Sequence, residues 1–237
     1  MSPSTVAAQL SKNKYVIPLR AHLDSEEALN RFTQLQKSFG NLSEDPYMNP
    51  EHRGTRTRRY GRFDFDFTTG ELSVLPNIPY VPGNPDNHNQ YQQGKPRLFE
   101  PLENETADNE LLQDIIRTFA VALPDDIKKT PAEIKLQQIR IIASGEANAS
   151  PTPEGIHRDG ETYVCVLIAN RENITGGEVK VYDKAGQNVI VSFTPETLDS
   201  YIIDDREVMH GVTPICPIDA SKPGYRDVFI INFNPVK

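Results

Sequence analysis

The sequence contains no tryptophan and only two cysteines, Cys165 and Cys216, among its 237 residues. Two cysteines are too few for a disulfide framework, and Cys165 lies in an apolar run that is typical of a buried strand. No apolar run reaches the roughly 18 residues that a membrane span needs. Residues 1–14 have no apolar segment of the signal-peptide type. We therefore expect a cytoplasmic protein that does not act at a membrane.

Basic residues are also fewer than acidic residues. Lysine and arginine number 25 against 33 aspartates and glutamates, which gives a net charge of −8. Such a balance argues against nucleic acid as a partner, because phosphate backbones are bound through an excess of basic side chains. The sequence shows no internal repeat and no convincing linker, and its length is enough for one well-packed domain. The sequence does not indicate the oligomeric state.

Two helices are predicted in the N-terminal half. Residues 1–13 resemble a polar, frayed lead-in. Asp24 and Glu27 have the spacing of a capping box, and apolar residues recur at helical spacing through residues 25–39. A second periodic segment covers residues 108–123 and ends at a proline.

A row of arginines lies between the two helices. Strand alternation places Arg56, Arg58, Tyr60 and Arg62 on one face. This face could be a solvated edge strand, whose charges prevent pairing with another chain, or the cationic wall of a cleft that binds a carboxylate. Residues 76–97 follow with five prolines, a long irregular segment of the kind that forms lids, binding loops or disordered regions.

The C-terminal half is rich in short strands with turn residues between them. A spacing of 8–12 residues with such turns is typical of a sandwich or jelly roll. A further short strand is expected at residues 15–19. The strands predicted in the C-terminal half cover residues 136–142, 162–169, 178–183, 188–193, 198–204, 206–212 and 227–233.

Three residues among these strands form a pattern that suits a metal. His157 and Asp159 are two residues apart, so in an extended strand their side chains would point to the same face. His210 follows on a later strand. Two histidines and one carboxylate that leave positions open favour non-haem Fe(II) over a structural zinc ion, which usually has four ligands rich in cysteine. Arg226 follows on an apolar strand, where its charge needs an anionic partner such as a dicarboxylate.

The chain resembles the Fe(II)- and 2-oxoglutarate-dependent dioxygenases, and within them the small enzymes that oxidise free aliphatic L-amino acids. The segments that carry the resemblance are His157–Asp159, the turn Gly176–Glu178, His210–Pro214 and Arg226 in Tyr-Arg-Asp-Val-Phe-Ile, with looser matches at residues 56–63, 94–99 and 138–140.

The resemblance implies a mainly β fold with flanking helices, namely a double-stranded β-helix, which is a jelly roll or cupin-like barrel. It implies one domain over residues 1–237. In that domain, about 1–130 would supply helical and loop support and a substrate lid, and about 131–237 the metal-binding jelly-roll core.

The same resemblance implies the roles of several residues and the co-substrates. His157, Asp159 and His210 would bind Fe(II). Arg226 would bind the distal carboxylate of 2-oxoglutarate, with Thr213 as a weaker candidate for a hydroxyl donor to it. O₂ would be the second co-substrate. The expected reaction is oxidation of an unactivated C–H bond, most simply hydroxylation, with release of succinate and CO₂.

A small amino acid substrate carries a carboxylate, for which an arginine is the natural partner. The candidates are Arg58, Arg62, Arg97 and Arg140. We favour Arg140, because an unpaired cation on an apolar strand would be costly.

Three alternatives stay open at the level of sequence. The same chemistry could end in oxidative cyclisation or desaturation. The barrel could be a cupin-like ligand-binding protein without oxygenase activity. The substrate could also be a side chain within a polypeptide, which would require an open groove.

Overall fold

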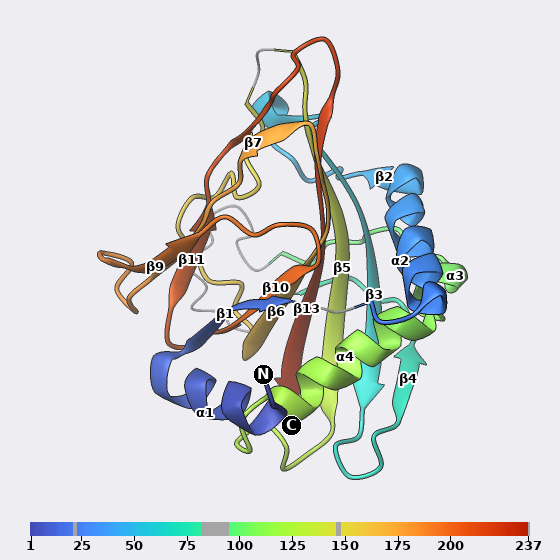
Figure 1. Cartoon of the computed structure of the whole chain (residues 1–237), viewed down its shortest axis with the longest axis vertical. Coiled ribbons are helices and arrows are strands. Elements are labelled where there is room, and N and C mark those ends of the chain that lie inside the picture. The colour runs from blue at the N-terminus through green and yellow to red at the C-terminus, as the bar shows by residue number, and fades with distance from the viewer. Residues whose placement is uncertain (21–22, 82–94, 146–147, 237) are drawn as a thin grey trace.

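The fold is that of a computed structural model, which describes residues 1–20, 23–81, 95–145 and 148–236 (Figure 1). Its largest element is an antiparallel sheet in the order β1-β10-β6-β13-β5-β3-β2, with β4 paired to β3. The strands are β1 (Tyr15–Arg20), β2 (Ser43–Glu44), β3 (Arg56–Phe65), β4 (Leu72–Leu75), β5 (Ala132–Ala143), β6 (Tyr163–Glu172), β10 (Asp199–Asp204) and β13 (Gly224–Pro235).

Two smaller sheets form a second layer beside the large one, with β9 and β11 at the left of Figure 1 and β7 toward its upper end. One has the order β11-β8-β9 and the other pairs β12 with β7. Their strands are β7 (Ile174–Gly176), β8 (Val179–Tyr182), β9 (Val189–Phe193), β11 (Met209–Val212) and β12 (Ile215–Pro217). The predicted strands of the C-terminal half are therefore present, and the sheets do not close into a complete barrel.

Helices cover the outer face of the large sheet (Figure 1). They are α1 (Pro3–Asn13), α2 (Glu26–Ser38), α3 (Asn104–Ala107) and α4 (Glu110–Ala122), with two 3₁₀ turns, η1 (Phe39–Asn41) and η2 (Pro50–His52). Leu112, Ile116 and Phe119 of α4 are buried against sheet residues such as Phe229. The two long helices predicted from periodicity are confirmed within two residues at each end.

The first residues of the chain correct one prediction. Residues 1–13 were expected to be a frayed lead-in, whereas α1 is a capped helix. The Ser2 hydroxyl accepts a hydrogen bond from the Thr5 N–H at 3.2 Å, and Val6 and Leu10 are buried one turn apart. Two apolar residues at i and i+4 suffice here because the sheet and α4 complete the apolar contact.

The start of α2 corrects a second detail. Ser25, not Asp24, is the N-cap, and its hydroxyl accepts a hydrogen bond from the Ala28 N–H at 3.0 Å. The apolar stripe is narrower than expected, since Phe32 and Leu35 are buried but Leu29 is 52% exposed.

Strand β3 also differs from one of its two sequence interpretations. It pairs with β5 along its whole length, from Arg56 opposite Ile141 to Phe65 opposite Ala132, and β2 and β4 pair with its other edge. The interpretation as a solvated edge strand is therefore wrong. Arg56 and Arg58 are 8% and 5% exposed and point toward the space between the layers, where a second apolar cluster lies.

Most of the predicted irregular segment at 76–97 lies outside the described residues. Its two ends are joined, because Tyr80 and Arg97 exchange backbone hydrogen bonds of 2.7 and 2.9 Å. Tyr80 packs with Tyr60 and Phe99 in a small aromatic cluster beside β3.

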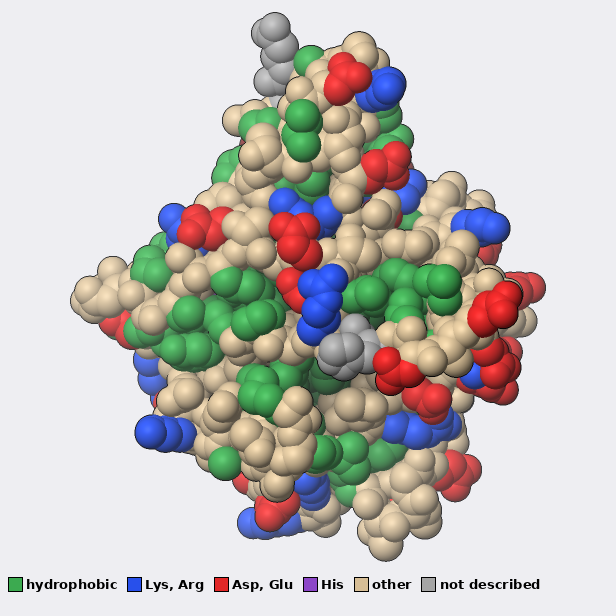
Figure 2. All heavy atoms as spheres, in the orientation of Figure 1, with side chains coloured by type: hydrophobic (Ala, Val, Ile, Leu, Met, Phe, Trp, Pro, Cys, Tyr) green, Lys and Arg blue, Asp and Glu red, His purple; other side chains and the backbone are tan. Residues whose placement is uncertain are grey.

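On the face seen in Figure 2, acidic and basic side chains are interspersed and form no continuous field of one sign. Among the helices of the described residues, none has the length and hydrophobicity that crossing a bilayer requires.

Candidate metal centre and active-site cavity

The His-x-Asp triplet lies in a loop before β6 and is held by a single bridge to β11. The backbone N–H of His157 donates to the His210 carbonyl at 2.9 Å, and the His210 N–H returns a bond of the same length to His157. The expectation of an extended strand at this point is wrong, since only His157 has a β-partner. The bridge sets the two histidines directly opposite each other, with ring centroids 4.4 Å apart.

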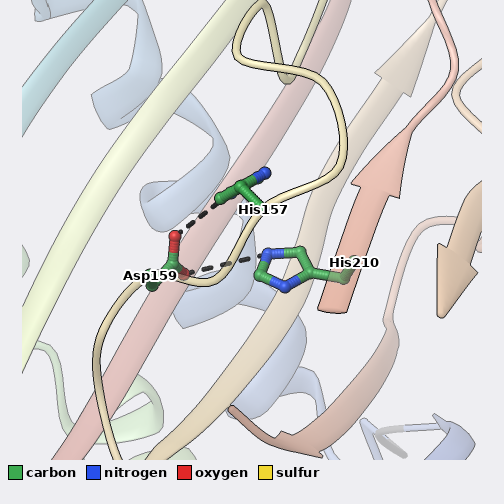
Figure 3. A group of neighbouring side chains, drawn as sticks. All are labelled: His157, Asp159 and His210. Atoms are coloured by element: carbon green, nitrogen blue, oxygen red, sulfur yellow. Dashed lines mark ion pairs between the residues drawn. The ribbon is translucent and has the colours of Figure 1, made fainter. Parts of the chain in front are cut away.

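The three side chains converge on one point (Figure 3). His157 Nε2 is 3.3 Å from Asp159 Oδ1, and His210 Nε2 is 3.9 Å from Asp159 Oδ2. One ligand atom from each residue lies within 4.8 Å of the others, and all three residues are buried. His157 Nδ1 is 3.0 Å from the Gly155 carbonyl. Donation of a proton to this oxygen leaves the Nε2 lone pair directed at the shared point, as metal binding requires.

The charges of the triad favour a cation between them. Burial by itself would lower the pKa of His157, but the carboxylates of Glu154 and Asp159 raise it to about 9. Burial lowers the pKa of His210 to about 4, with the neighbouring His157 adding to the effect. Burial opposes ionisation of Asp159, yet the two histidines lower its pKa to about 2. A metal ion would take the place of the proton that the triad holds without it.

Asp205 fixes the loop that carries Asp159. Its fully buried carboxylate accepts the backbone N–H groups of Asp159, Gly160 and Glu161 at 3.1, 2.8 and 2.9 Å. Three successive N–H groups around one carboxyl group form a nest that holds the loop. Burial and the charge of Asp159 raise the pKa of Asp205 to about 7, and the backbone hydrogen bonds oppose that shift. Asp205 Oδ1 is also 3.8 Å from His210 Nδ1, so this side chain lies beside two members of the triad.

A cavity opens from the triad into the space between the two layers. Its walls combine aliphatic side chains, which come mainly from β5, β6 and β13, with polar and charged side chains from β3, β5, β10, β11, β13 and the loop before β6. The lining residues are Arg56, Arg58, Gln137, Ile139, Ile141, Pro151, Thr152, Glu154, His157, Asp159, Val164, Val166, Tyr201, His210, Val212, Arg226, Val228 and Ile230.

Arg226 lies in this cavity and is 3% exposed. Burial lowers the pKa of its guanidinium, and a hydrogen bond with Tyr201 partly opposes that shift. Nε and Nη2 of Arg226 have no hydrogen-bond partner among the described residues. A buried guanidinium with two unused donors is suited to a carboxylate, which can accept both.

The arginines that were predicted to bind the substrate carboxylate differ in their positions relative to the cavity. Arg58 lines the cavity, where Nη1 donates to Asp45 at 3.1 Å and the guanidinium lies 3.9 Å from the centre of the Phe99 ring. Arg62 does not line it and instead pairs with Glu133 at 2.7 Å.

Arg97 and Thr213 are near the site without lining the cavity. Arg97 lies over the Tyr47 ring, and burial and the charge of Arg58 lower its pKa. The Thr213 hydroxyl accepts the Glu178 N–H at 2.9 Å.

Arg140 points away from the cavity. Its guanidinium makes a two-fold ion pair with Asp227, at 2.7 and 2.8 Å, and lies over the Tyr225 ring. Its neighbours Ile139 and Ile141 line the cavity, so strand alternation directs Arg140 to the opposite face. The sequence argument that Arg140 needs an anion is correct, but Asp227 on the adjacent strand provides that anion.

Sequence reasoning missed three residues of the site, namely Glu154, Tyr201 and Asp205. Glu154 Oε1 is 3.6 Å from His157 Nε2. The one sequence feature that could have indicated this contact is the position of Glu154 three residues before His157. Nothing local indicates the contact of Tyr201 with Arg226 or the nest around Asp205, because both depend on strand pairing.

Comparison with known proteins gives the family. The sequence profile of the 2OG-Fe dioxygenases matches residues 36–232. This chain belongs to the 2OG-Fe dioxygenase family. An L-isoleucine-4-hydroxylase from Bacillus thuringiensis is 25% identical over 94% of this chain and 91% of its own length. A 3(1)-hydroxy-L-isoleucine 4-dioxygenase from Pantoea ananatis is 26% identical over 89% of this chain and 83% of its own.

The structure of a bsmA homolog from Methylobium petroleophilum PM1 superposes on this dioxygenase with a TM-score of 0.82 and 27% identity. It covers 99% of this chain and 94% of that one. The fold prediction of a double-stranded β-helix with flanking helices is thereby confirmed.

As a 2OG-Fe dioxygenase, the enzyme uses Fe(II), 2-oxoglutarate and O₂. The buried triad and the unused donors of Arg226 fit an iron ion and a dicarboxylate.

Proposed function

We propose that this enzyme hydroxylates a free aliphatic L-amino acid at an unactivated C–H bond. The observation that carries the proposal is the composition of one cavity. It joins the His157–Asp159–His210 triad to cationic groups and aliphatic walls within a buried space. The names of the two relatives above supply the substrate class.

In this proposal His157, Asp159 and His210 bind Fe(II), and Arg226 binds the distal carboxylate of 2-oxoglutarate. Bound iron with 2-oxoglutarate and O₂ supplies the oxidising power, and 2-oxoglutarate leaves as succinate and CO₂. Tyr201 holds the Arg226 guanidinium through their hydrogen bond. Asp205 holds the loop of Asp159.

The remaining groups orient the substrate. Arg58, together with its neighbour Arg56 on the same face of β3, provides the carboxylate site. Arg58 Nε has no hydrogen-bond partner among the described residues, which supports this role. The aliphatic side chains of β5, β6 and β13 exclude water and accept a branched apolar side chain. The protein thus contributes orientation and a dry cavity.

The test is a panel of free L-amino acids scored for succinate release. The protein is purified without oxygen, loaded with Fe(II) and given 2-oxoglutarate and air. At least one aliphatic amino acid should stimulate succinate release and yield a product heavier by one oxygen atom. A panel without a substrate, or a product that lacks the added oxygen, would contradict the proposal.

Variants connect the activity to the triad. His157→Ala and Asp159→Ala should abolish turnover, since each removes a ligand. His52→Ala is the matched control, because His52 lies in η2 and does not line the cavity. Retained turnover in either triad variant would refute the ligand assignment.

A further inference from the structure

Strand pairing places a second buried arginine beside Arg226. Arg171 on β6 is the register partner of Arg226 on β13, so the two side chains lie on the same face of the large sheet. Arg226 is 3% exposed, and the side chain of Arg171 is 9% exposed. The charge of Arg171 adds to the effect of burial in lowering the pKa of Arg226. Two cations are therefore packed side by side where Arg226 lines the cavity.

The surroundings of Arg171 leave part of its charge and of its hydrogen-bonding capacity unused. Its Nη2 donates to the Gly176 carbonyl at 2.9 Å. The carboxylate paired with it is that of Glu196, at 3.9 Å from Nε, and the Glu196 side chain is 66% exposed, so water screens the contact. Arg171 Nη1 is buried and, within the described residues, has no hydrogen-bond partner, as is the case for Nε and Nη2 of Arg226. Three unused donors on two adjacent guanidinium groups favour an anion as their partner.

The turn at Gly176 and Gly177 packs against both arginines. A Cβ atom on Gly177 would lie 2.8 Å from Arg171 Nη1 and 3.6 Å from Arg226 Cδ, so the two side chains come within 4 Å of one point. A side chain at residue 177 would displace the Arg171 guanidinium, and the φ of +73° there also favours glycine. The Gly177 N–H donates to the Pro214 carbonyl at 3.3 Å, which holds the turn in place. The guanidinium group of Arg171 thus has a fixed position beside Arg226.

Two buried cations on neighbouring strands repel each other unless an anion lies beside them. We propose that Arg171 is a positioning residue of the co-substrate site, whose charge adds to that of Arg226 in binding the distal carboxylate of 2-oxoglutarate. This inference rests on the proposed function, because that function assigns the distal carboxylate to Arg226. It implies strong discrimination against 2-oxo acids whose far end is uncharged, since these leave both guanidinium groups desolvated without an anion.

The experiment compares Arg171→Met, which removes the charge and keeps an apolar side chain, with Arg171→Lys, which keeps the charge. The Fe(II)-loaded proteins are titrated calorimetrically with 2-oxoglutarate in the absence of oxygen. Arg171→Met should weaken 2-oxoglutarate binding about tenfold, as expected for the loss of a second charge near a partly buried carboxylate. Arg171→Lys should stay within about threefold of the wild type.

Two further measurements separate the charge of Arg171 from a role in the fold. The first uses 2-oxopentanoate, which has the chain length of 2-oxoglutarate and no distal carboxylate. Its affinity, measured by competition with 2-oxoglutarate, should agree within about twofold between Arg171→Met and the wild type. The second is the matched control Arg117→Met on α4, where the arginine side chain is 39% exposed, and this variant should bind both ligands as the wild type does.

The possible results are distinguishable. Unchanged 2-oxoglutarate affinity in Arg171→Met overturns the role of Arg171 alone. Equal weakening of 2-oxoglutarate and 2-oxopentanoate, or equal weakening in the methionine and lysine variants, assigns Arg171 to the fold and also overturns it. Unchanged 2-oxoglutarate affinity in Arg226→Met refutes instead the co-substrate site on which the proposed function depends, and a wild-type enzyme that oxidises no amino acid refutes the proposed function itself.

Discussion

Replacement of Asp205 by asparagine tests whether the hydrogen bonds between Asp205 and the loop of Asp159 determine the geometry of the metal site. The carboxylate accepts one N–H group through Oδ1 and two through Oδ2. An asparagine amide keeps one accepting oxygen. If that oxygen serves Gly160 and Glu161, the NH₂ group faces the N–H of Asp159, and two donors then oppose each other.

The magnitude follows from these contacts. Loss of one hydrogen bond that leaves the buried N–H of Asp159 without an acceptor costs about 1–3 kcal/mol of folding free energy. Displacement of the Asp159 loop should also weaken Fe(II) binding by about 10- to 100-fold, the usual effect of changing a residue that supports a metal ligand. The double mutant Asp205→Asn/Asp159→Ala should bind Fe(II) no worse than Asp159→Ala alone, because Asp205 acts through Asp159.

The assay is an anaerobic Fe(II) titration in the presence of 2-oxoglutarate, combined with urea unfolding. Asp199→Asn is the matched control, since Asp199 is a buried aspartate that pairs with Arg20. The control should lose stability and keep its Fe(II) affinity within about twofold of the wild type. If Asp205→Asn lost only stability and bound Fe(II) like the wild type, the nest would be a folding element without influence on the metal.

Three further predictions concern the proton on His157 and Arg140, the arginine that points away from the cavity. Because the pKa of His157 is raised to about 9, the metal-free protein holds a proton there at pH 7.5, so Fe(II) binding should release about one proton. Calorimetry in buffers of different ionisation enthalpy measures it, and a heat that is independent of the buffer would contradict the charge assignment. The raised pKa also stabilises the metal-free fold below pH 6.5, and this contribution should disappear as the pH rises through 9. Arg140→Met leaves the fully buried carboxylate of Asp227 unpaired and should cost about 3–5 kcal/mol of stability without changing the KM for the amino acid. Urea unfolding and steady-state kinetics test this prediction. A raised KM in a variant that remains stable would show instead that Arg140 contributes to substrate binding.

Much of the site could be predicted because its chemistry lies in short sequence patterns. His157 and Asp159 are close enough in sequence to share a site whatever the exact backbone, and this is why their side chains converge although the segment is a loop rather than a strand. Arg226 on an apolar strand signalled a buried charge that needs an anion. The strands themselves followed from runs of apolar residues between turns, since the large sheet is covered on both faces.

The assignment of arginines to the cavity could not be predicted in the same way. Alternation along β3 correctly placed Arg56 and Arg58 on one face. Alternation along β5 likewise separates Arg140 from Ile139 and Ile141. Neither pattern predicts which face of its strand is turned toward the metal site.

The sequence by itself determined which residues share a face, where the strands lie and which side chains can hold iron. Only the tertiary structure decided that Arg58 faces the cavity while Asp227 neutralises Arg140, and that Asp205 and Glu154 flank the triad. The physical reason is that local spacing fixes the direction of a side chain relative to its own strand. The register between strands that are remote in sequence fixes which charges meet, and this register depends on the packing of the whole sheet.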